Sequence, residues 1–331
     1  MTGAPPPECL EVARILRDGE RFLLVPHVHL DGDDLGSMLG LAHALDRLGK
    51  TCELYSPDPL PEIFRWIPGA ERLTDRLPRG PYDAVLLMEC AADSRLPPGI
   101  RPSELGRVVV NLDHHPDNHV TADLSWVDPT MSALGEMAVL LVDCLGVPLD
   151  REIATPLYVA ILTDSGGFQY SNVSPRTHEV LARLVEHLDE IDEISRNLFQ
   201  NRRAEELLLL GQVLQTLQRS ADGRMAWADF TADMLAATGA REEDAQNLVE
   251  DVNRVRGSEA LALFKHVRPG EIRVSLRSTG PAVNAVAARF GGGGHRLAAG
   301  VSFQTDDLEG VRQRVLGALA EEMETPGTPP R

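Results

Sequence analysis

The 331-residue chain lacks any apolar run near the ~20 residues that span a membrane, and its N-terminal segment lacks the apolar stretch of a secretory signal. We therefore expect a cytoplasmic protein. The chain has few cysteines, and they are far apart with no C-x-x-C pair: Cys9, Cys52, Cys90 and Cys144. This spacing favours reduced thiols over a disulfide framework or a zinc knuckle.

Positive charge is also scarce, because the formal net charge is −18. Proteins that coat long nucleic acids neutralise many phosphates with a basic face, so this composition argues against that class. A nucleic-acid ligand should therefore be short and should meet a local basic patch. The length of 331 residues and the 43% hydrophobic content favour two domains.

The first half of the chain alternates short apolar runs with helical patterns. Strands are expected at 21–26, 51–56, 84–89 and 107–112, and helices at 33–49, 132–146, 151–164 and 174–188. Ser174 is expected to cap the last of these helices, with Pro175 in its first turn. The alternation predicts an α/β domain over residues 1–190, with a doubly wound and mostly parallel sheet.

The second half of the chain has more charge and more polar alternation. A continuous helical pattern over 192–218 overlaps the predicted linker between domains, residues 191–205. Further strands are expected at 224–230, 259–267, 271–278 and 301–304, and helices at 282–290 and 306–321. These elements predict a smaller α+β domain over 206–322, followed by a disordered tail at 323–331.

Acidic and imidazole side chains gather where the predicted strands end. His27, Asp31 and Asp33 follow the first strand, Glu89 ends the third, Asp113, His114 and His115 follow the fourth, and Asp164 ends the helix at 151–164. Ligands of open α/β sheets bind at this edge. Crowded carboxylates repel one another unless protons or cations neutralise them. Carboxylates with imidazoles and no thiolate suit an ion such as Mn²⁺, and this many ligands can hold two ions, as in phosphoryl hydrolysis.

Simpler interpretations apply to each motif taken alone. His27 by itself would more often be a structural residue at a strand end. The run "DHH" by itself is only a weak indication of metal binding. The run "DGDDLG" resembles the start of a calcium loop, but Leu35 stands at position five and Ala42 at position twelve, where a bidentate Glu is required. The ordered set of motifs, rather than any one of them, predicts a metal site.

The same motifs resemble those of the DHH phosphoesterase superfamily, and within it the NrnA type with its C-terminal DHH-associated domain. The resemblance covers nearly the whole chain through "HVHLDGDDLGS", "MECAADSR", "NLDHHPDN", "LTDSGGFQYSNVSPRT", "SLRS" and "FGGGGHRLAAG". It implies two Mn²⁺ ions, with Mg²⁺ as the alternative. It also implies an oligoribonuclease (nanoRNase) that is a phosphatase of 3′-phosphoadenosine 5′-phosphate (pAp) as well.

The resemblance assigns a role to each residue at the strand ends. His27 and Asp31 would hold the first ion, and Asp33, His114 and Asp164 the second. His115 would face the scissile phosphate, and Asp113 would orient this cluster without binding metal.

Glu89 departs from the pattern, because the bridging residue of the second motif is usually Asp. Glu also offers two oxygens, so we expect Glu89 to bridge the ions with adjusted spacing. The alternatives are that Asp93 replaces it or that the second ion is weakly held. Cys90 beside it is interpreted as a packing residue.

The glycine run in the second domain would by itself indicate a flexible turn, and no GK[ST] follows to make it a Walker loop. With Arg296 after it and "LRS" upstream it predicts a phosphate cradle, because close backbone N–H groups and cations bind phosphate. The candidate substrate contacts are Arg277, Ser278, Gly292, Gly293, Gly294 and His295. The run "NRR" at 201–203 is interpreted as a solvated helix face.

The expected function is metal-dependent hydrolysis, by an activated water, of short oligoribonucleotides (about two to five units) to 5′-mononucleotides and of pAp to AMP and phosphate. Two further candidate substrates are pApA and cyclic di-AMP. The alternatives left open are a cyclic or linear dinucleotide phosphodiesterase, a RecJ-like single-strand exonuclease, a family II pyrophosphatase and a non-catalytic nucleotide sensor. The preference between RNA and DNA and the formation of a homodimer are left open too.

Overall fold

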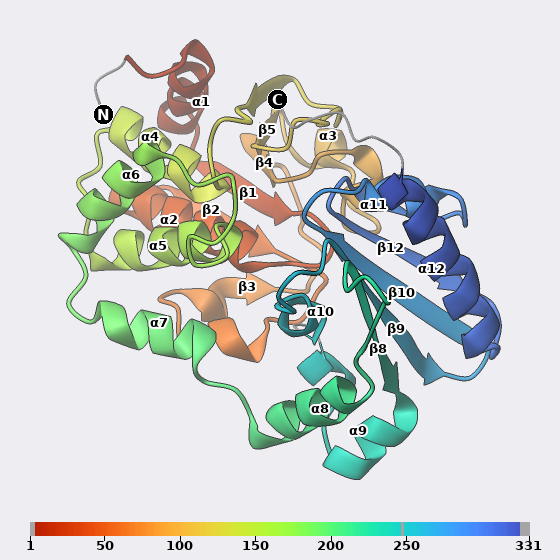
Figure 1. The fold of residues 1–331 in the computed structure, drawn as a ribbon. Coiled ribbons are helices and arrows are strands. Elements are labelled where there is room, and N and C mark those ends of the chain that lie inside the picture. Colours follow the sequence, from red (N-terminus) through yellow and green to blue (C-terminus); the bar gives the residue numbers. More distant parts are fainter. Residues whose placement is uncertain (1–3, 246–247, 325–331) are drawn as a thin grey trace. The chain divides into compact units, whose positions relative to one another are not determined.

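A computed structural model describes residues 4–245 and 248–324 of the chain (Figure 1). The chain divides into two compact units, Met1–Asn201 and Arg202–Arg331. The division falls inside the predicted linker, residues 191–205. None of the helices in the described ranges combines the length and the apolarity that crossing a bilayer requires.

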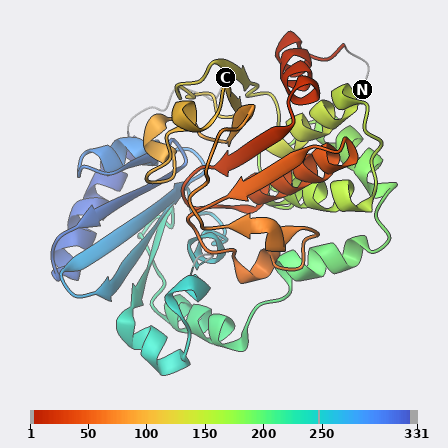
Figure 2. The same cartoon turned by 180° about the vertical axis from the view of Figure 1, so that it is seen from behind.

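The first unit contains a six-stranded sheet in which all neighbouring strands are parallel (Figure 2). Its strands are β1 (Arg21–Pro26), β2 (Thr51–Tyr55), β3 (Leu73–Thr74), β4 (Ala84–Met88), β5 (Val109–Asp113) and β6 (Leu124–Val127). The order β3-β2-β1-β4-β5-β6 reverses direction between β1 and β4. Such a switch point is where open α/β sheets bind their ligands. The predicted α/β class with a mostly parallel sheet is confirmed.

Helices cover one face of this sheet. They are α1 (Pro7–Asp18), α2 (Gly32–Arg47), α4 (Leu134–Leu145), α5 (Arg151–Asp164), α6 (Pro175–Val185) and α7 (Ile191–Phe199). Phe22 and Leu24 of β1 pack in the core beneath them. Leu23 and Val25 point to the other face, which the short helix α3 (Pro102–Leu105) and loop segments cover. Burial on both faces explains the uninterrupted apolar run of β1.

Three glycines at a spacing of four let α2 approach α5 closely. A Cβ atom at Gly32 would lie 2.5 Å from Thr163 Oγ1, one at Gly40 would lie 2.5 Å from Leu157 Cδ2, and one at Gly36 would overlap the carbonyl oxygen of Pro156. The first turn of α2 therefore packs against the last turn of α5. This packing brings the acidic start of one helix to the acidic end of the other.

The structure confirms one local prediction and corrects another. Ser174 caps α6 by accepting from the Thr177 backbone N–H. The predicted continuous helix at 192–218 is wrong, because the chain leaves the helical conformation after α7 and starts again at α8 (Ala204–Gln215). Residues 201–203 lie between these helices rather than on a helix face, and Arg202 is paired with Asp251 at 2.7 Å.

The second unit contains a mixed six-stranded sheet in the order β11-β12-β10-β9-β8-β7. Its strands are β7 (Gln218–Arg219), β8 (Met225–Thr231), β9 (Ala260–Arg268), β10 (Glu271–Ser278), β11 (Gly293–His295) and β12 (Ala298–Phe303). Only β8 and β9 run parallel among these described strands. This arrangement confirms the predicted smaller α+β domain.

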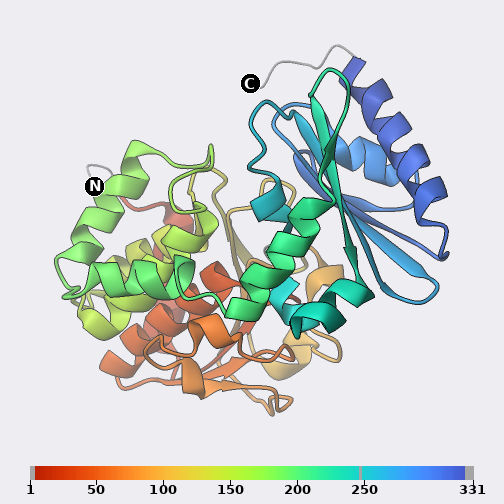
Figure 3. The ribbon, with the colours of Figure 1, turned by 60° about the horizontal axis from the view of Figure 1, so that its bottom comes forward.

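Both faces of the second sheet carry helices. The helices are α8, α9 (Ala232–Thr238), α10 (Leu248–Val252), α11 (Val283–Ala288) and α12 (Leu308–Glu324). Side chains of α11 and α12 share one core with β9, β10 and β12, and α12 runs along that face (Figure 3). Side chains of α8 and α10 share a second core with β8 and β9. Of the predicted tail at 323–331, the first two residues belong to α12, and 325–331 lie outside the described residues.

Candidate metal centre

The switch point of the first sheet places three polar residues side by side. Pro26 of β1 pairs with Met88 of β4, so His27 and Glu89 leave adjacent strands at the same level. Met88 pairs in turn with Leu112 of β5, which brings His114 to the same edge. His27 is 4% exposed and Glu89 is 1% exposed. Glu89 also has φ 54°, a left-handed conformation that residues with a side chain adopt rarely and mostly at functional sites.

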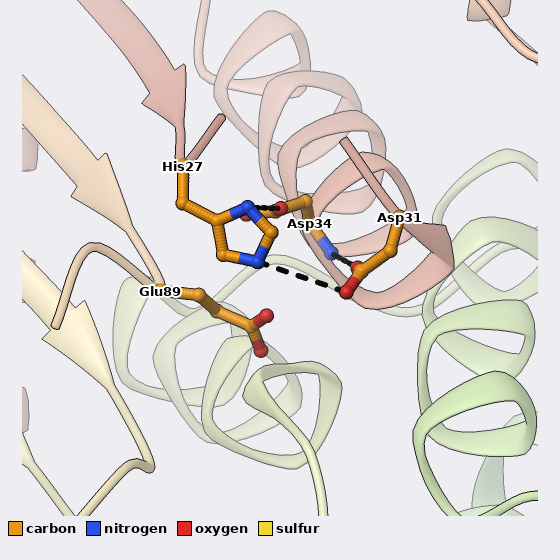
Figure 4. Close-up of side chains that lie close together, drawn as sticks. All are labelled: His27, Asp31, Asp34 and Glu89. Carbon is orange, nitrogen blue, oxygen red and sulfur yellow. Dashed lines mark hydrogen bonds and ion pairs between the residues drawn. The ribbon is translucent and has the colours of Figure 1, made fainter. Parts of the chain in front are cut away.

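The first of two ligand groups surrounds His27. Its members are His27, Asp31, Asp34 and Glu89, and their ligand atoms lie within 4.8 Å of one another (Figure 4). Asp31 caps α2, and its Oδ1 accepts from the backbone N–H groups of Asp33 and Asp34, both at 3.0 Å. The second oxygen of Asp31 faces His27 Nε2 at 3.8 Å. The start of the helix therefore fixes one carboxylate beside the imidazole.

The second ligand group consists of Asp33, Glu89 and His114. His114 Nε2 lies 3.3 Å from Glu89 Oε1 and 3.9 Å from Asp33 Oδ2. The carbonyl oxygen of Met131 lies 3.3 Å from His114 Nδ1. A carbonyl can only accept, so Nδ1 carries the proton and Nε2 keeps its lone pair for a metal. Asp164 lies outside both groups, but its Oδ2 is 3.6 Å from His114 Nε2.

The start of α4 holds Asp33 in place. The backbone N–H groups of Leu134 and Gly135 donate to its carboxylate at 2.6 and 2.9 Å, and Ser37 Oγ donates at 3.1 Å. These donors engage both carboxylate oxygens of Asp33 and fix the orientation of the carboxylate at the site.

The arrangement fits divalent cations with oxygen and nitrogen ligands. Glu89 belongs to both groups, so one carboxylate can reach two ions. Glu89 Oε1, His114 Nε2 and both oxygens of Asp34 are buried without a hydrogen-bond partner in the described structure. Burying a polar atom without a partner is costly, and one cation would satisfy Glu89 Oε1 and His114 Nε2 together.

The electrostatics lead to the same requirement for positive charge. Burial, then the charge of Asp33, raises the pKa of Glu89 well above its usual 4.5. Burial, then Asp31 and Asp33, raises the pKa of Asp34 well above 3.8. Burial and Asp33 raise the pKa of Asp164 from 3.8 to about 8. Burial also lowers the pKa of His27. Burial and like charge therefore favour the protonated form of the three carboxyl groups unless cations replace the protons, and burial favours the neutral form of His27.

Asp113 acts on His115 and lies outside both ligand groups. One of its oxygens accepts from the His115 backbone N–H at 2.9 Å and lies 2.7 Å from His115 Nδ1, while Asn118 donates to the other oxygen. Burial alone would lower the pKa of His115, but the hydrogen bond and charge of Asp113 outweigh burial and raise it. Asp113 thus fixes the orientation of the imidazole and favours its charged form.

The structure disfavours Asp93 as the replacement for Glu89. Asp93 accepts from the backbone N–H and the hydroxyl of Thr121, both at 2.9 Å, and belongs to neither ligand group. Cys90 lies in the apolar cluster that contains Leu23 and Val25, on the face of the sheet that α3 and loop segments cover.

In the second unit, the candidate phosphate contacts have partners of their own. Arg277 Nε donates to Glu250 Oε1 at 2.6 Å, and Ser278 Oγ donates to the Pro281 carbonyl at 2.6 Å. A Cβ at Gly294, which has φ 134°, would lie 2.6 Å from the Ala298 carbonyl oxygen. A Cβ at Gly292 would overlap the carbonyl oxygen of Gly300, whereas Gly293 has open space.

Gly292 and Gly294 therefore let this segment pack closely against β12, which explains structurally why glycine stands at these two positions. The side chain of His295 lies outside the described residues.

Asp34 is the member of the first ligand group that the sequence motifs did not predict. It is in phase with Met38, Leu41 and Leu45 on a buried face of α2. An acidic residue at a position of an apolar stripe is the signal that could have identified it, because a buried carboxylate requires a partner.

Comparison with known proteins identifies two family domains in the chain. The family model "DHH family, N-terminal domain" matches residues 21–161, and the "DHHA1 domain" model matches residues 230–321. A relative from Thermus thermophilus, named "Bifunctional oligoribonuclease and PAP phosphatase NrnA", is 36% identical over 330 residues, which is 98% of each chain.

Two solved structures share the fold. An exopolyphosphatase-related protein from Bacteroides fragilis has a TM-score of 0.85 at 22% identity, covering 98% of this chain and 100% of that one. RecJ from Thermus thermophilus, in complex with Mn²⁺, has a TM-score of 0.56 at 16% identity, covering 98% of this chain and 56% of that one. The family matches and the relative identical over nearly the full length decide the assignment: the chain belongs to the DHH family of phosphoesterases.

Proposed function

We propose that this protein hydrolyses short oligoribonucleotides to 5′-mononucleotides and pAp to AMP and phosphate, with two divalent cations as cofactors. The observation that carries the proposal is the pair of ligand groups that share Glu89 at the switch point of the sheet. The Thermus thermophilus relative, which is named as an oligoribonuclease and PAP phosphatase, supports the choice of substrates.

His27, Asp31 and Glu89 would hold the first cation, and Asp33, His114, Asp164 and Glu89 the second. When bound, such ions lower the pKa of an attacking water and offset the charge that develops on phosphoryl oxygens. Mn²⁺ is the proposed ion, because the ligands are carboxylates and imidazoles without thiolates. The Mn²⁺ complex of RecJ supports this choice, and Mg²⁺ is the alternative.

His115 is the proposed hydrogen-bond donor to the scissile phosphate. The Asp113 carboxylate lies 2.7 Å from its Nδ1 and so fixes the orientation of the ring. The raised pKa favours the charged imidazole, whose N–H is a stronger donor to a phosphoryl oxygen. Asp113 is therefore a positioning residue in this proposal.

The second unit is proposed to bind the remainder of the substrate through Arg277, Ser278, Gly292, Gly293, Gly294 and His295. Arg277 already neutralises Glu250, so a substrate phosphate has to compete with this carboxylate. The net charge of −18 disfavours tracking along an extended polyanion. We therefore propose a preference for about two to five nucleotides, with pApA and cyclic di-AMP as further candidate substrates.

One substrate panel tests the proposal. The metal-loaded enzyme is assayed on pAp, a diribonucleotide, its DNA counterpart, a 24-mer RNA, pyrophosphate and cyclic di-AMP. We expect rapid release of AMP from pAp and of 5′-mononucleotides from the diribonucleotide, with much slower attack on the 24-mer. Preferred cleavage of pyrophosphate or cyclic di-AMP, processive digestion of the 24-mer, or binding without turnover would each overturn the proposal in favour of one of the alternatives.

A further inference from the structure

Asp34 belongs to the first ligand group, but the proposed function gives it no role, although its burial demands one. The residue is 0% exposed, and neither of its carboxylate oxygens has a hydrogen-bond partner in the described structure. Isolated buried carboxylates are strongly disfavoured, so such a group needs a compensating interaction. Its near neighbour is His27, whose Nδ1 lies 3.2 Å from Asp34 Oδ2 and likewise makes no hydrogen bond in the structure.

The two nitrogens of His27 face different surroundings. Nδ1 faces Asp34, whereas Nε2 faces Asp31 at 3.8 Å, on the side where Glu89 lies (Figure 4). The ring nitrogens of an imidazole point in divergent directions, so only one of them can bind a given ion. Nε2 faces the two other carboxylates and is the ligand atom, which leaves Nδ1 and its proton to Asp34.

We propose that Asp34 is a positioning residue for the first metal ion: it accepts the Nδ1 proton of His27 and so presents the lone pair of Nε2 to the ion. A carboxylate behind a ligating imidazole fixes the tautomer, orients the ring and increases its basicity. The inference rests on the metal centre of the proposed function, but it concerns metal affinity rather than hydrolysis.

Three substitutions separate this role from a structural one. Asp34→Ala removes the acceptor and should weaken Mn²⁺ binding at one site by ~10–100-fold. Asp34→Asn keeps an acceptor oxygen in the same place and should recover part of that loss. Glu136→Gln is the matched control, because Glu136 is also 0% exposed but bonds Ser132 and lies outside both ligand groups. It should leave both Mn²⁺ affinities unchanged.

Binding is measured by titrating each metal-free variant with Mn²⁺ and following the free ion by electron paramagnetic resonance. Thermal unfolding without metal shows whether each variant folds. The tautomer is read from ¹⁵N spectra of histidine-labelled protein loaded with diamagnetic Cd²⁺, with the His27 signals assigned through His27→Gln.

The expected result is Nε2 of His27 on the metal, Nδ1 protonated, and an affinity order of wild type, Asp34→Asn, Asp34→Ala. Metal coordination through Nδ1, or a folded Asp34→Ala variant that binds both Mn²⁺ ions as tightly as the wild type, would overturn the role of Asp34. A wild-type protein that binds no Mn²⁺ would instead overturn the metal centre, and the inference with it.

Discussion

Replacement of Glu89 by Gln should leave the metal-free protein intact and remove its response to metal. Glu89 is 1% exposed, and burial raises its pKa well above 4.5, which favours the neutral side chain when no metal is bound. Gln has the same shape and is also neutral. The free energy of unfolding of the metal-free variant should therefore lie within about 1 kcal/mol of the wild-type value, because the substitution leaves charge and packing unchanged.

The metal-bound state should respond very differently. A ligand present at 100 times its Kd stabilises the folded protein by ~2.7 kcal/mol. For a domain of the size of the first unit, Met1–Asn201, this stabilisation raises the Tm by roughly 5–11 °C. Glu89 belongs to both ligand groups, so Glu89→Gln should lose most of this gain. We expect turnover of a dinucleotide to fall by at least ~100-fold, equivalent to ~2.7 kcal/mol of transition-state stabilisation. Glu89→Asp keeps the charge and should keep substantial activity.

Thermal unfolding in chelator and in Mn²⁺, together with dinucleotide turnover, measures both effects in the same preparations. Glu136→Gln serves as the control for loss of a buried carboxyl. If Glu89→Gln retained the Mn²⁺-induced rise in Tm and its turnover, Glu89 would not be a ligand. A large destabilisation of the metal-free variant would contradict the neutral state assigned to Glu89.

Three further predictions concern pH, packing and substrate binding. The folded-state pKa of Asp164 is raised from 3.8 to about 8, so the unfolded chain loses this proton first. The contribution of Asp164 to stability, measured as the difference between the metal-free wild type and Asp164→Asn in urea unfolding with chelator, should therefore fall as pH rises from about 4 to about 8, and a difference that rises instead would refute the shift. Gly36→Ala places a Cβ against the Pro156 carbonyl and should lower the free energy of unfolding by ~1–3 kcal/mol, whereas a gain in Tm would show that α2 and α5 have room. Arg277→Ala should lower kcat/KM on a dinucleotide by ~10–100-fold, the loss of one charge-assisted contact, and should change hydrolysis of bis-p-nitrophenyl phosphate much less. Equal losses on both substrates would argue against a role of Arg277 in holding the remote end of the substrate.

The sequence predicted best which polar side chains lie together where the sheet topology alone determines that they are close. Parallel strands end at one edge, so His27, Glu89 and His114 had to lie together once their apolar runs were identified as neighbouring strands. Asp164 comes from a helix, and its position near this edge depends on the close packing of α2 on α5. Neither the composition nor the hydrophobic periodicity of the sequence predicts how closely these two helices pack.

Two features of the structure were not predicted from the sequence: the break between α7 and α8, and the place of Asp34 beside His27. Ile194, Leu198, Leu209 and Val213 fall on one continuous helical period, but the first two pack in the core of the first unit and the last two in a core of the second. Periodicity shows that residues share a helix face, not that they share a core, so the break between α7 and α8 was missed. Asp34 was missed because the motifs identify ligands by position, whereas its role follows from complete burial beside His27.

The most direct measurement counts metal ions and activity in the same sample. Protein stripped by chelator is titrated with Mn²⁺, bound metal is determined by elemental analysis after desalting, and dinucleotide hydrolysis is followed at each step. The two ligand groups predict two Mn²⁺ per chain, no turnover without metal, and activity that returns as the sites fill. Full activity in excess chelator, or no bound Mn²⁺ in an active enzyme, would contradict a metal centre built on Glu89.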